Sequence, residues 1–229
     1  LEEGRAGALD GREEALGLGV SISVLSVLLM LLSGGALAAA LLAFTIWFYA
    51  HFYTMILKRR TPENIVIGGL AGALPPAIAW AGATGGLTLD PLLLVAIIFI
   101  WTPPHFWALS LTHQEDYAAA KVPMLPLTHG AAETRKRILL YSLVLAPLGM
   151  APVFTGLGGW LYAAISGLGG LVFLILAARV ARSKAGDGQA DKAANKPAIA
   201  LFAYSILYLA ALFAAGVSEW RRSTAGGVV

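Results

Sequence analysis

Seven apolar segments of membrane-spanning length constrain this chain more than any other feature. They cover residues 16–32, 36–57, 65–83, 91–112, 138–154, 160–181 and 198–217. A helix needs about 20 apolar residues to cross the hydrocarbon core of a bilayer. Backbone groups in lipid must be satisfied within the segment, and these runs lack the alternation of β-barrel strands. We therefore predict an all-α, polytopic membrane helical bundle with seven transmembrane helices. Residues 16–217 form one transmembrane domain between a cytoplasmic N-terminal segment (1–15) and a short tail (218–229).

The composition agrees with a protein embedded in a lipid bilayer. Charged residues make up 13% of the 229 residues and the mean hydropathy is +0.75, whereas a soluble domain has about 25% charged residues. The chain contains no cysteine, which excludes disulfides, a thiolate nucleophile and a zinc site of the cysteine type. We expect no nucleic-acid partner.

The basic residues fall on alternate connections between the segments. One set comprises residues 1–15, 58–64, 113–137 and 182–197. Together with Arg179, this set holds fourteen of the sixteen Lys and Arg residues. The internal connections of the other set hold none and comprise residues 33–35, 84–90 and 155–159. Loops rich in Lys and Arg stay on the cytoplasmic side. The pattern predicts a multi-pass protein of the cell inner (plasma) membrane whose basic end faces the cytoplasm.

Two local patterns concern packing. Residues 183–196 are small, polar and charged, which predicts a flexible, solvated linker. Small residues in two apolar segments are expected to permit close helix packing: Gly68, Gly72 and Ala73, with Gly167 and Gly170. Neither pattern by itself indicates a function.

A cluster of three cations follows the second apolar segment. Lys58, Arg59 and Arg60 come a little over one helical turn after Tyr53. Such cations satisfy the positive-inside rule and complement a helix dipole, so a structural interpretation suffices. They are equally suited to bind a phosphate group, Arg through a bidentate fork. In that functional interpretation the Tyr53 hydroxyl faces the same pocket.

Residues 101–126 form an unusually polar stretch at the edge of the fourth segment. His105 follows two prolines that kink a helix, and Glu115 and Asp116 lie where the helix leaves the membrane. Ionisable groups at this depth are functional-site hypotheses. His105 is either a packed histidine or a site residue. The carboxylates are either a solvated helix end or ligands for Mg²⁺, which prefers oxygen ligands and bridges to phosphates. Together with the cations, beneath an apolar bundle, they favour a prenyl diphosphate substrate.

Two runs of residues are long enough to compare with a known family. The first is YTMILKRRTPENIVIGGLAGALPP at residues 53–76, with Trp80 after it. The second is WTPPHFWAL at residues 101–109, followed by EDY at 115–117 and VPMLP at 122–126. They resemble the protohaem IX farnesyltransferases (haem O synthases), which are UbiA-type intramembrane prenyltransferases. The similarity covers residues 16–217.

The resemblance implies a fold and a reaction. The fold is a nine-helix bundle whose active site opens toward the cytoplasm. The reaction transfers a farnesyl group from farnesyl diphosphate to a vinyl group of protohaem IX, giving haem O and diphosphate, with Mg²⁺ as cofactor and haem as substrate. Haem O then serves terminal oxidases, so haem A synthase or oxidase assembly factors are the implied protein partners. There are two alternatives. One is another UbiA-type transferase that acts on a quinone or phenol precursor, and the other is a non-catalytic membrane fragment.

The resemblance also implies roles for individual residues. The diphosphate-binding set is Tyr53, Lys58, Arg59, Arg60, Asn64 and Lys121. The catalytic set is His105, Asp116 and Tyr117, and the metal-binding pair is Glu115 and Asp116. The walls of the substrate pocket are Trp101, Phe106 and Trp107. His105 is implied as an axial ligand of the haem, an acid or base, or a packing residue.

The chain departs from the family at one motif. The family carries an aspartate-rich N-x-x-x-D-x-x-x-D motif after its second helix, which binds Mg²⁺ and diphosphate, and the 229 residues contain no such spacing. The seven segments resemble the family's third to ninth helices. We therefore expect an N-terminally truncated chain, with two helices and the aspartate motif upstream of Leu1. We predict that these residues alone are inactive.

Overall fold

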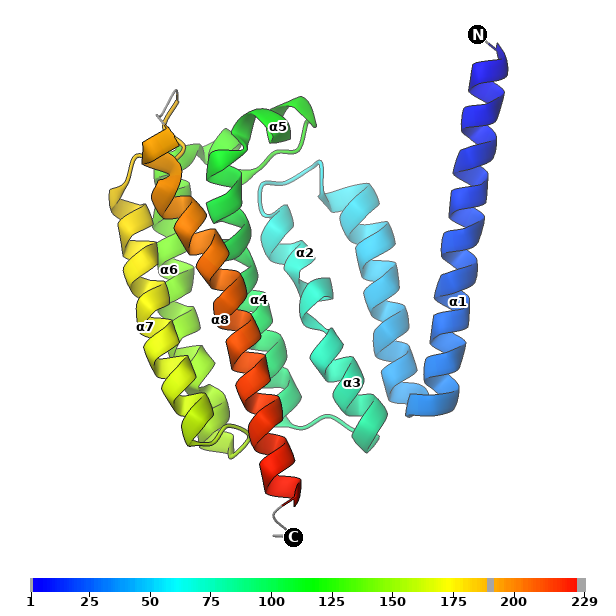
Figure 1. The fold of residues 1–229 in the computed structure, drawn as a ribbon. Helices are drawn as coiled ribbons and strands as arrows, with labels where there is room; N and C mark the ends of the chain where they lie inside the picture. Colours follow the sequence, from blue (N-terminus) through cyan, green and yellow to red (C-terminus); the bar gives the residue numbers. More distant parts are fainter. Residues whose placement is uncertain (1, 189–191, 226–229) are drawn as a thin grey trace.

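The computed structural model describes residues 2–188 and 192–225, and this part of the chain is helical without any strand. Leu1, residues 189–191 and the end of the predicted tail, residues 226–229, lie outside the described residues. The helices are α1 (Glu2–Trp47), η1 (Phe48–Leu57), α2 (Asn64–Ala73), α3 (Pro75–Thr84), α4 (Leu89–Thr112), α5 (Gln114–Ala119), α6 (Leu125–Thr155), α7 (Trp160–Arg182) and α8 (Lys192–Ala225) (Figure 1).

The predicted all-α, polytopic bundle is confirmed. Six helical stretches of the described residues are long and apolar enough to span a membrane. The first of them, Glu13–Leu57, is two helices joined at Gly35, whose φ of 81° and ψ of 176° are non-helical. Glycine adopts such a positive φ without steric cost. Figure 1 shows the chain reversing there, so residues 36–57 run antiparallel to the first part of α1. With this turn, each of the seven predicted segments corresponds to a helical region.

The helices α1 and α8 extend beyond the predicted segments, to Glu2 and from Lys192 to Ala225, and two internal boundaries also differ from the sequence prediction. Residues 65–83 are divided into α2 and α3 because Pro75 and Pro76 occupy the first turn of α3, where proline is favoured and cannot extend a preceding helix. The fifth segment begins at Leu125 instead of residue 138, with a break at Gly130 (φ 82°). Its early turns carry polar and charged residues, so hydropathy alone does not mark them.

α4 is the central helix of the bundle. It packs against α2, α3, α6 and α8, and the largest fully buried side chain of the described residues, Trp107, belongs to it. The first part of α1 lies at the edge, and its apolar side chains between residues 16 and 32 are largely exposed. Exposed apolar surface of this extent marks an interaction site or a face toward lipid.

The two predicted sets of connections lie at opposite ends of the bundle. Figure 1 shows the turn after η1, helix α5 and the connection from α7 to α8 at one end. The reversal in α1, the connection from α3 to α4 and the turn from α6 to α7 lie at the other. At this second end the Glu219 carboxylate of α8 accepts hydrogen bonds from the backbone N–H groups of Gly159 (2.5 Å) and Leu161 (2.8 Å). It therefore satisfies donors that the start of α7 leaves open.

The start of the α7–α8 connection is packed, in contrast to the predicted solvated linker. Ala185 is fully buried. Arg135 of α6 donates to the Ala185 carbonyl (2.6 Å) and to both Asp187 carboxylate oxygens (2.8 and 3.1 Å). Gln114 of α5 donates to the Gly186 carbonyl (2.7 Å). These bonds hold residues 183–188 against α5 and α6. The buried Arg135 guanidinium requires partners for its donors, and this segment supplies them.

Gly68 permits the closest helix approach in the first half of the bundle. A Cβ atom at Gly68 would lie 2.3 Å from the Tyr53 ring, whereas one at Gly72 would meet no atom within 4 Å. The expectation of close packing is therefore confirmed for Gly68 and wrong for Gly72.

We predict opposite effects of alanine at these two glycines. Gly68→Ala forces the Tyr53 ring away and should lower the free energy of unfolding by about 1–3 kcal/mol. Gly72→Ala, on the same helix, should leave it unchanged or raise it by up to about 1 kcal/mol, because alanine is the better helix former. Thermal unfolding of the detergent-purified variants measures both. Equal destabilisation by the two changes would contradict the packing described here.

Candidate functional site

The cationic cluster follows a π-helix. Over residues Phe48–Leu57 the helix is wound more widely than an α-helix, and the Lys58 N–H donates to the Tyr53 carbonyl at 2.8 Å, five residues back. π-helical turns are rare in proteins, and those that occur are often found at functional sites. The wider turn places Tyr53 about one turn before Lys58. The Tyr53 ring lies against Gly68 of α2.

The backbone of the turn after η1 is held by neighbouring side chains. The fully buried Asn64 donates from its amide to the carbonyls of Lys58 (3.2 Å) and Thr61 (2.8 Å). Glu63 pairs with Arg137 of α6 at 2.6 Å. Asn64 thus shapes the turn, and direct binding of diphosphate by its amide stays a prediction.

The three cations of this turn are free to bind an anion. Lys58, Arg59 and Arg60 are exposed, and none forms an ion pair with any side chain that the structure describes. The fixed backbone and the unpaired side chains together give a dense positive charge at one end of the bundle. Focused charge of this kind attracts anionic groups.

The acidic residues lie on the short helix α5, directly after α4. Glu115 and Asp116 are exposed in its first turn and make no ion pair or side-chain hydrogen bond with the described residues. Burial and the neighbouring Asp116 raise the pKa of the Tyr117 phenol above its usual value, so the phenol is a neutral donor at physiological pH. Figure 1 shows α5 and the turn after η1 at the same end of the bundle, and joint binding of one diphosphate by the two elements stays a prediction.

Glu115 and Asp116 suit Mg²⁺ as a pair of carboxylates that share the ion with a phosphate. In the described ranges, no three His, Asp or Glu side chains converge on a point that would hold a metal ion. Mg²⁺ is often bound by one or two carboxylates together with water and substrate phosphates. Glu115 and Asp116 offer carboxylate oxygens without partners among the described residues, and so they suit Mg²⁺ when a phosphate supplies further ligands.

Lys121 occupies a backbone conformation that favours glycine. Its φ is +53°, the only positive φ of a residue other than glycine in the described chain. The hydrogen bonds from Lys121 N to Ala118 O and from Val122 N to Tyr117 O, both 3.0 Å, form a C-terminal cap on α5. Glycine is the usual residue at this position of such a cap. A strained residue with an exposed charged side chain next to the site is a functional hypothesis in its own right.

His105 lies inside the bundle between α4 and α8. Its ring stacks on Trp101 (centroids 4.2 Å, 17°) and on Phe202 (4.6 Å, 23°). Its Nδ1 lies 2.7 Å from the Ser205 hydroxyl oxygen, and the residue is 8% exposed. The Trp101 indole donates to the Ser205 carbonyl at 2.8 Å. His105 is thus packed and hydrogen-bonded, but it is held by side chains that are themselves fixed.

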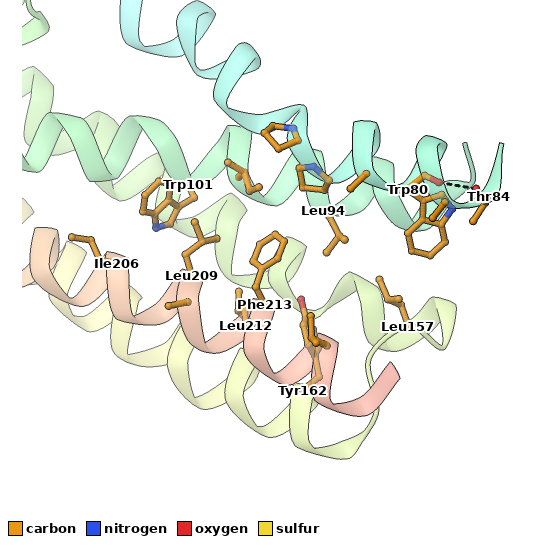
Figure 2. Close-up of a pocket in the computed structure, with 18 residues that line it drawn as sticks. Trp80, Thr84, Leu94, Trp101, Leu157, Tyr162, Ile206, Leu209, Leu212 and Phe213 are labelled. Atoms are coloured by element: carbon orange, nitrogen blue, oxygen red, sulfur yellow. Dashed lines mark hydrogen bonds between the residues drawn. The ribbon is translucent and has the colours of Figure 1, made fainter. Parts of the chain in front are cut away.

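A large apolar cavity lies between α3, α4 and α8. Its volume is about 900 Å³ and its walls are almost entirely apolar. Figure 2 shows Trp101 at one end, Trp80 and Thr84 at the other, and Phe213 pointing into the space between them. Trp101 lies on the same face of α4 as His105, so the cavity begins at the His105 cluster and extends away from the basic end.

Only Trp101 of the three predicted pocket residues lines this cavity. Trp107 is fully buried and packs edge-to-face on Tyr141 of α6 at 5.3 Å. Phe106 is 36% exposed and meets the edge of His105. The two residues follow Trp101 in sequence but point to other faces, because successive helical residues are about 100° apart.

Helix α8 contributes a face to the site that the sequence did not predict. Phe202, Ser205 and Ile206 and, further along, Leu209 and Phe213 recur at helical spacing on the face toward His105 and the cavity. Ser205 carries a recognisable signal, since it is a hydroxyl in the middle of an apolar segment, and polar residues at that depth indicate a function or a packing bond. The apolar residues of this face of α8 carry no such signal in the sequence.

Comparison with known proteins agrees with this geometry. The model of the UbiA prenyltransferase family matches residues 6–206. The chain is 61% identical over 227 residues to a protein of Caulobacter sp. (strain K31), 61% over 229 residues to one of Caulobacter vibrioides, and 58% over 208 residues to one of Hyphomonas neptunium. Each of the three relatives is named protoheme IX farnesyltransferase.

These alignments cover 90, 93 and 91% of this chain but 66, 68 and 65% of the relatives. The chain therefore spans about two thirds of the length of the curated relatives it matches. No solved structure matches it. On the family model and these identities, the chain belongs to the UbiA prenyltransferase family.

Proposed function

We propose that this protein transfers a farnesyl group from farnesyl diphosphate to a vinyl group of protohaem IX, giving haem O and diphosphate. The observation that carries the proposal is the pairing of unpartnered charges at one end of the bundle with an apolar cavity between α3, α4 and α8. A prenyl diphosphate has the same two parts. The shared name of the relatives, protoheme IX farnesyltransferase, supports the choice of donor and acceptor.

The diphosphate end of the substrate is assigned to the basic end. Lys58, Arg59 and Arg60 are exposed on a turn whose backbone is already fixed by Asn64 and Glu63. Cations held in place before the reaction stabilise charge that develops on a leaving group without further reorganisation. Lys121, with Tyr53 and Tyr117 as neutral donors, completes the anion-binding surface in this proposal.

Glu115 and Asp116 are the residues of this chain that would hold Mg²⁺ beside the diphosphate. The ion would supply a Lewis acid that neutralises the leaving group. The two carboxylates are exposed and without ion pairs to described side chains, so they are available for this role.

The farnesyl chain is assigned to the cavity of about 900 Å³ between α3, α4 and α8. Its apolar walls exclude water, and their burial of the chain provides binding energy in proportion to the apolar area covered. Trp101, at the end nearest His105, presents an aromatic ring where positive charge on the allylic carbon would be stabilised.

The reaction proposed for this arrangement is electrophilic. The allylic C–O bond breaks with its electron pair on the diphosphate, which the cations of the turn bind. The vinyl group of haem attacks the farnesyl cation to form the new C–C bond, and water adds to the carbocation left on haem. The product carries a hydroxyethylfarnesyl side chain.

Two alternatives have less support. A UbiA-type transferase acting on a quinone or phenol precursor shares the fold, but the relatives at 53–61% identity carry the haem name. A transporter usually places charged residues near the bilayer midplane. In this chain the cationic turn at Lys58–Arg60 and the acidic helix α5 lie at one end of the bundle, which favours an enzyme with an edge-facing site.

The basic end is proposed to face the cytoplasm, with the protein in the inner membrane. Fourteen of the sixteen Lys and Arg residues belong to the connections of this end or to the adjoining helix turn. Such asymmetry sets the orientation of multi-pass proteins. Haem A synthase or oxidase assembly factors are the proposed recipients of the product.

We predict that Lys58→Ala lowers kcat/KM for farnesyl diphosphate by about 10- to 100-fold, because a hydrogen bond to a charged group contributes about 1.5–3 kcal/mol. The measurement is haem O formation by mass spectrometry, with the protein expressed from its complete reading frame. Lys136→Ala is the matched control, since Lys136 is an exposed cation without an ion pair to described residues. Equal losses in the two variants would refute a specific diphosphate site.

We predict that Lys121→Gly separates stability from activity. Glycine relieves the positive φ and should raise the free energy of unfolding by up to about 1 kcal/mol, while loss of the cation lowers affinity for diphosphate. Lys121→Ala keeps the strain and should lose affinity without gaining stability. Thermal unfolding and a diphosphate competition assay give the two readouts. Unchanged affinity in both variants would mean that Lys121 only caps α5.

We predict that the 229 residues alone do not form haem O, because they lack the aspartate-rich motif of the family. The comparison is between this chain and the product of its reading frame extended upstream, each purified in the same detergent and assayed with both substrates. Full activity of the 229 residues would show that the residues described here suffice.

A further inference from the structure

We propose that Ser205 is a positioning residue that holds His105 in one tautomer and leaves the Nε2 atom of that histidine as the base of the reaction. The inference rests on the proposed function and adds to it a residue on α8 and a step in which a proton must be removed.

The hydrogen bonds of Ser205 determine which ring nitrogen carries the proton. The Ser205 hydroxyl donates to the Phe202 carbonyl at 2.6 Å, which uses its single proton. The same oxygen lies 2.7 Å from Nδ1 of His105, so at that contact it is the acceptor and Nδ1–H is the donor. A neutral imidazole has one donor and one acceptor nitrogen. The lone pair of His105 is therefore on Nε2.

The ring is also fixed in orientation. Trp101 and Phe202 stack on its two faces at 4.2 and 4.6 Å, and the Trp101 indole donates to the Ser205 carbonyl at 2.8 Å. Ser205 thus binds the histidine through its hydroxyl and the neighbouring tryptophan through its carbonyl. A base whose rotamer and tautomer are set before the substrate arrives needs no rearrangement in the reaction.

Nε2 is the part of the ring that remains available. It has no hydrogen-bond partner among the described side chains, and it is not one of the fully enclosed polar atoms without a partner. No carboxylate of the described residues bonds to the ring. His105 therefore forms no ion pair with the described residues. Its Nε2 atom remains available to accept a proton from a reactant.

The cluster lies where the two parts of a prenyl diphosphate would meet. On one side, Trp101 and Ile206 line the cavity of about 900 Å³. On the other, Leu109 and Phe202 line a smaller cavity of about 230 Å³ that extends to His113 at the basic end. Along α4, His105 lies between Trp101 and Leu109, and along α8 its partner Ser205 lies between Phe202 and Ile206. His105 is thus placed between the region assigned to the hydrocarbon chain and the end that carries the charges.

The proposed reaction contains one step that needs a base at this place. Water attacks the carbocation on the former vinyl group, its oxygen forms the new C–O bond, and one of its protons is transferred to Nε2. The electron pair of the broken O–H bond stays on the oxygen, which becomes the product hydroxyl. His105 is then protonated on both nitrogens and returns the Nε2 proton to solvent.

The direct test is the tautomer of His105 in the full-length protein. ¹⁵N NMR of histidine-labelled protein, with the His105 signals assigned by loss in His105→Asn, should show a proton on Nδ1 and none on Nε2. Ser205→Ala should give a mixture of tautomers, and Ser205→Thr should restore the single form because it keeps the hydroxyl. Ser142→Ala is the matched control, since the buried Ser142 bonds only to the Ile138 carbonyl of its own helix. A proton on Nε2 in the unaltered protein would overturn the proposal.

The second test is kinetic. Ser205→Ala should lower kcat by about 10-fold or more, since general bases contribute about 10²- to 10⁴-fold, with KM for farnesyl diphosphate nearly unchanged and with recovery in Ser205→Thr. Unchanged kcat in Ser205→Ala, or altered haem absorption bands without a change in kcat, would overturn the base role, and the latter result would assign Nε2 to the haem iron. Failure of the unaltered full-length protein to form haem O would refute the proposed function and, with it, the base role. The tautomer measurement would still decide the role of Ser205 in positioning His105.

Discussion

The hydrocarbon core of the bilayer tolerates neither an unpaired backbone group nor an unpaired charge, and the arrangement of this protein depends on that constraint. It requires long helices, and it moves the Lys and Arg residues to the connections. It also makes the polar groups that remain at depth easy to interpret. His105, Ser205 and the Trp101 indole lie inside the bundle, and each is hydrogen-bonded to one of the others or to a carbonyl of α8. The constraint therefore explains both the distribution of charge and the connected cluster between α4 and α8.

Hydropathy predicted the seven segments because spanning length and lack of charge are properties of composition, which the sequence displays directly. It did not predict the break at Leu74, which depends on the backbone at Pro75. It also did not predict the early start of α6, because the first turns of that helix carry polar and charged residues. The cationic turn and the acidic helix were recognisable from residue type. The pairing of Ser205 with His105 was not, since the two residues are 100 positions apart and only packing of α8 against α4 brings them together.

Two departures from regular backbone geometry flank the same end of the bundle. The π-helical turns of η1 come directly before Lys58, and the positive φ of Lys121 comes directly after α5. Each arrangement is less favourable than the regular alternative, an α-helical turn in one case and a glycine in the other. Such costs persist where the surrounding structure or the function requires them. They point to the charged end independently of any family comparison, and they do so at two elements that are separate in sequence.

The division of the molecule into a charged end and an apolar interior bears on the order of events in the proposed reaction. A farnesyl cation exposed to water would be captured by it before the vinyl group of haem could attack, so the cavity must stay dry until the C–C bond has formed. Water is nevertheless a reactant in the last step. A single polar cluster between the dry cavity and the charged end meets both requirements. It supplies a proton acceptor at the boundary, and the walls along the hydrocarbon chain stay apolar. In this chain that cluster consists of His105 and Ser205, with Trp101 and Phe202 closing the space around them.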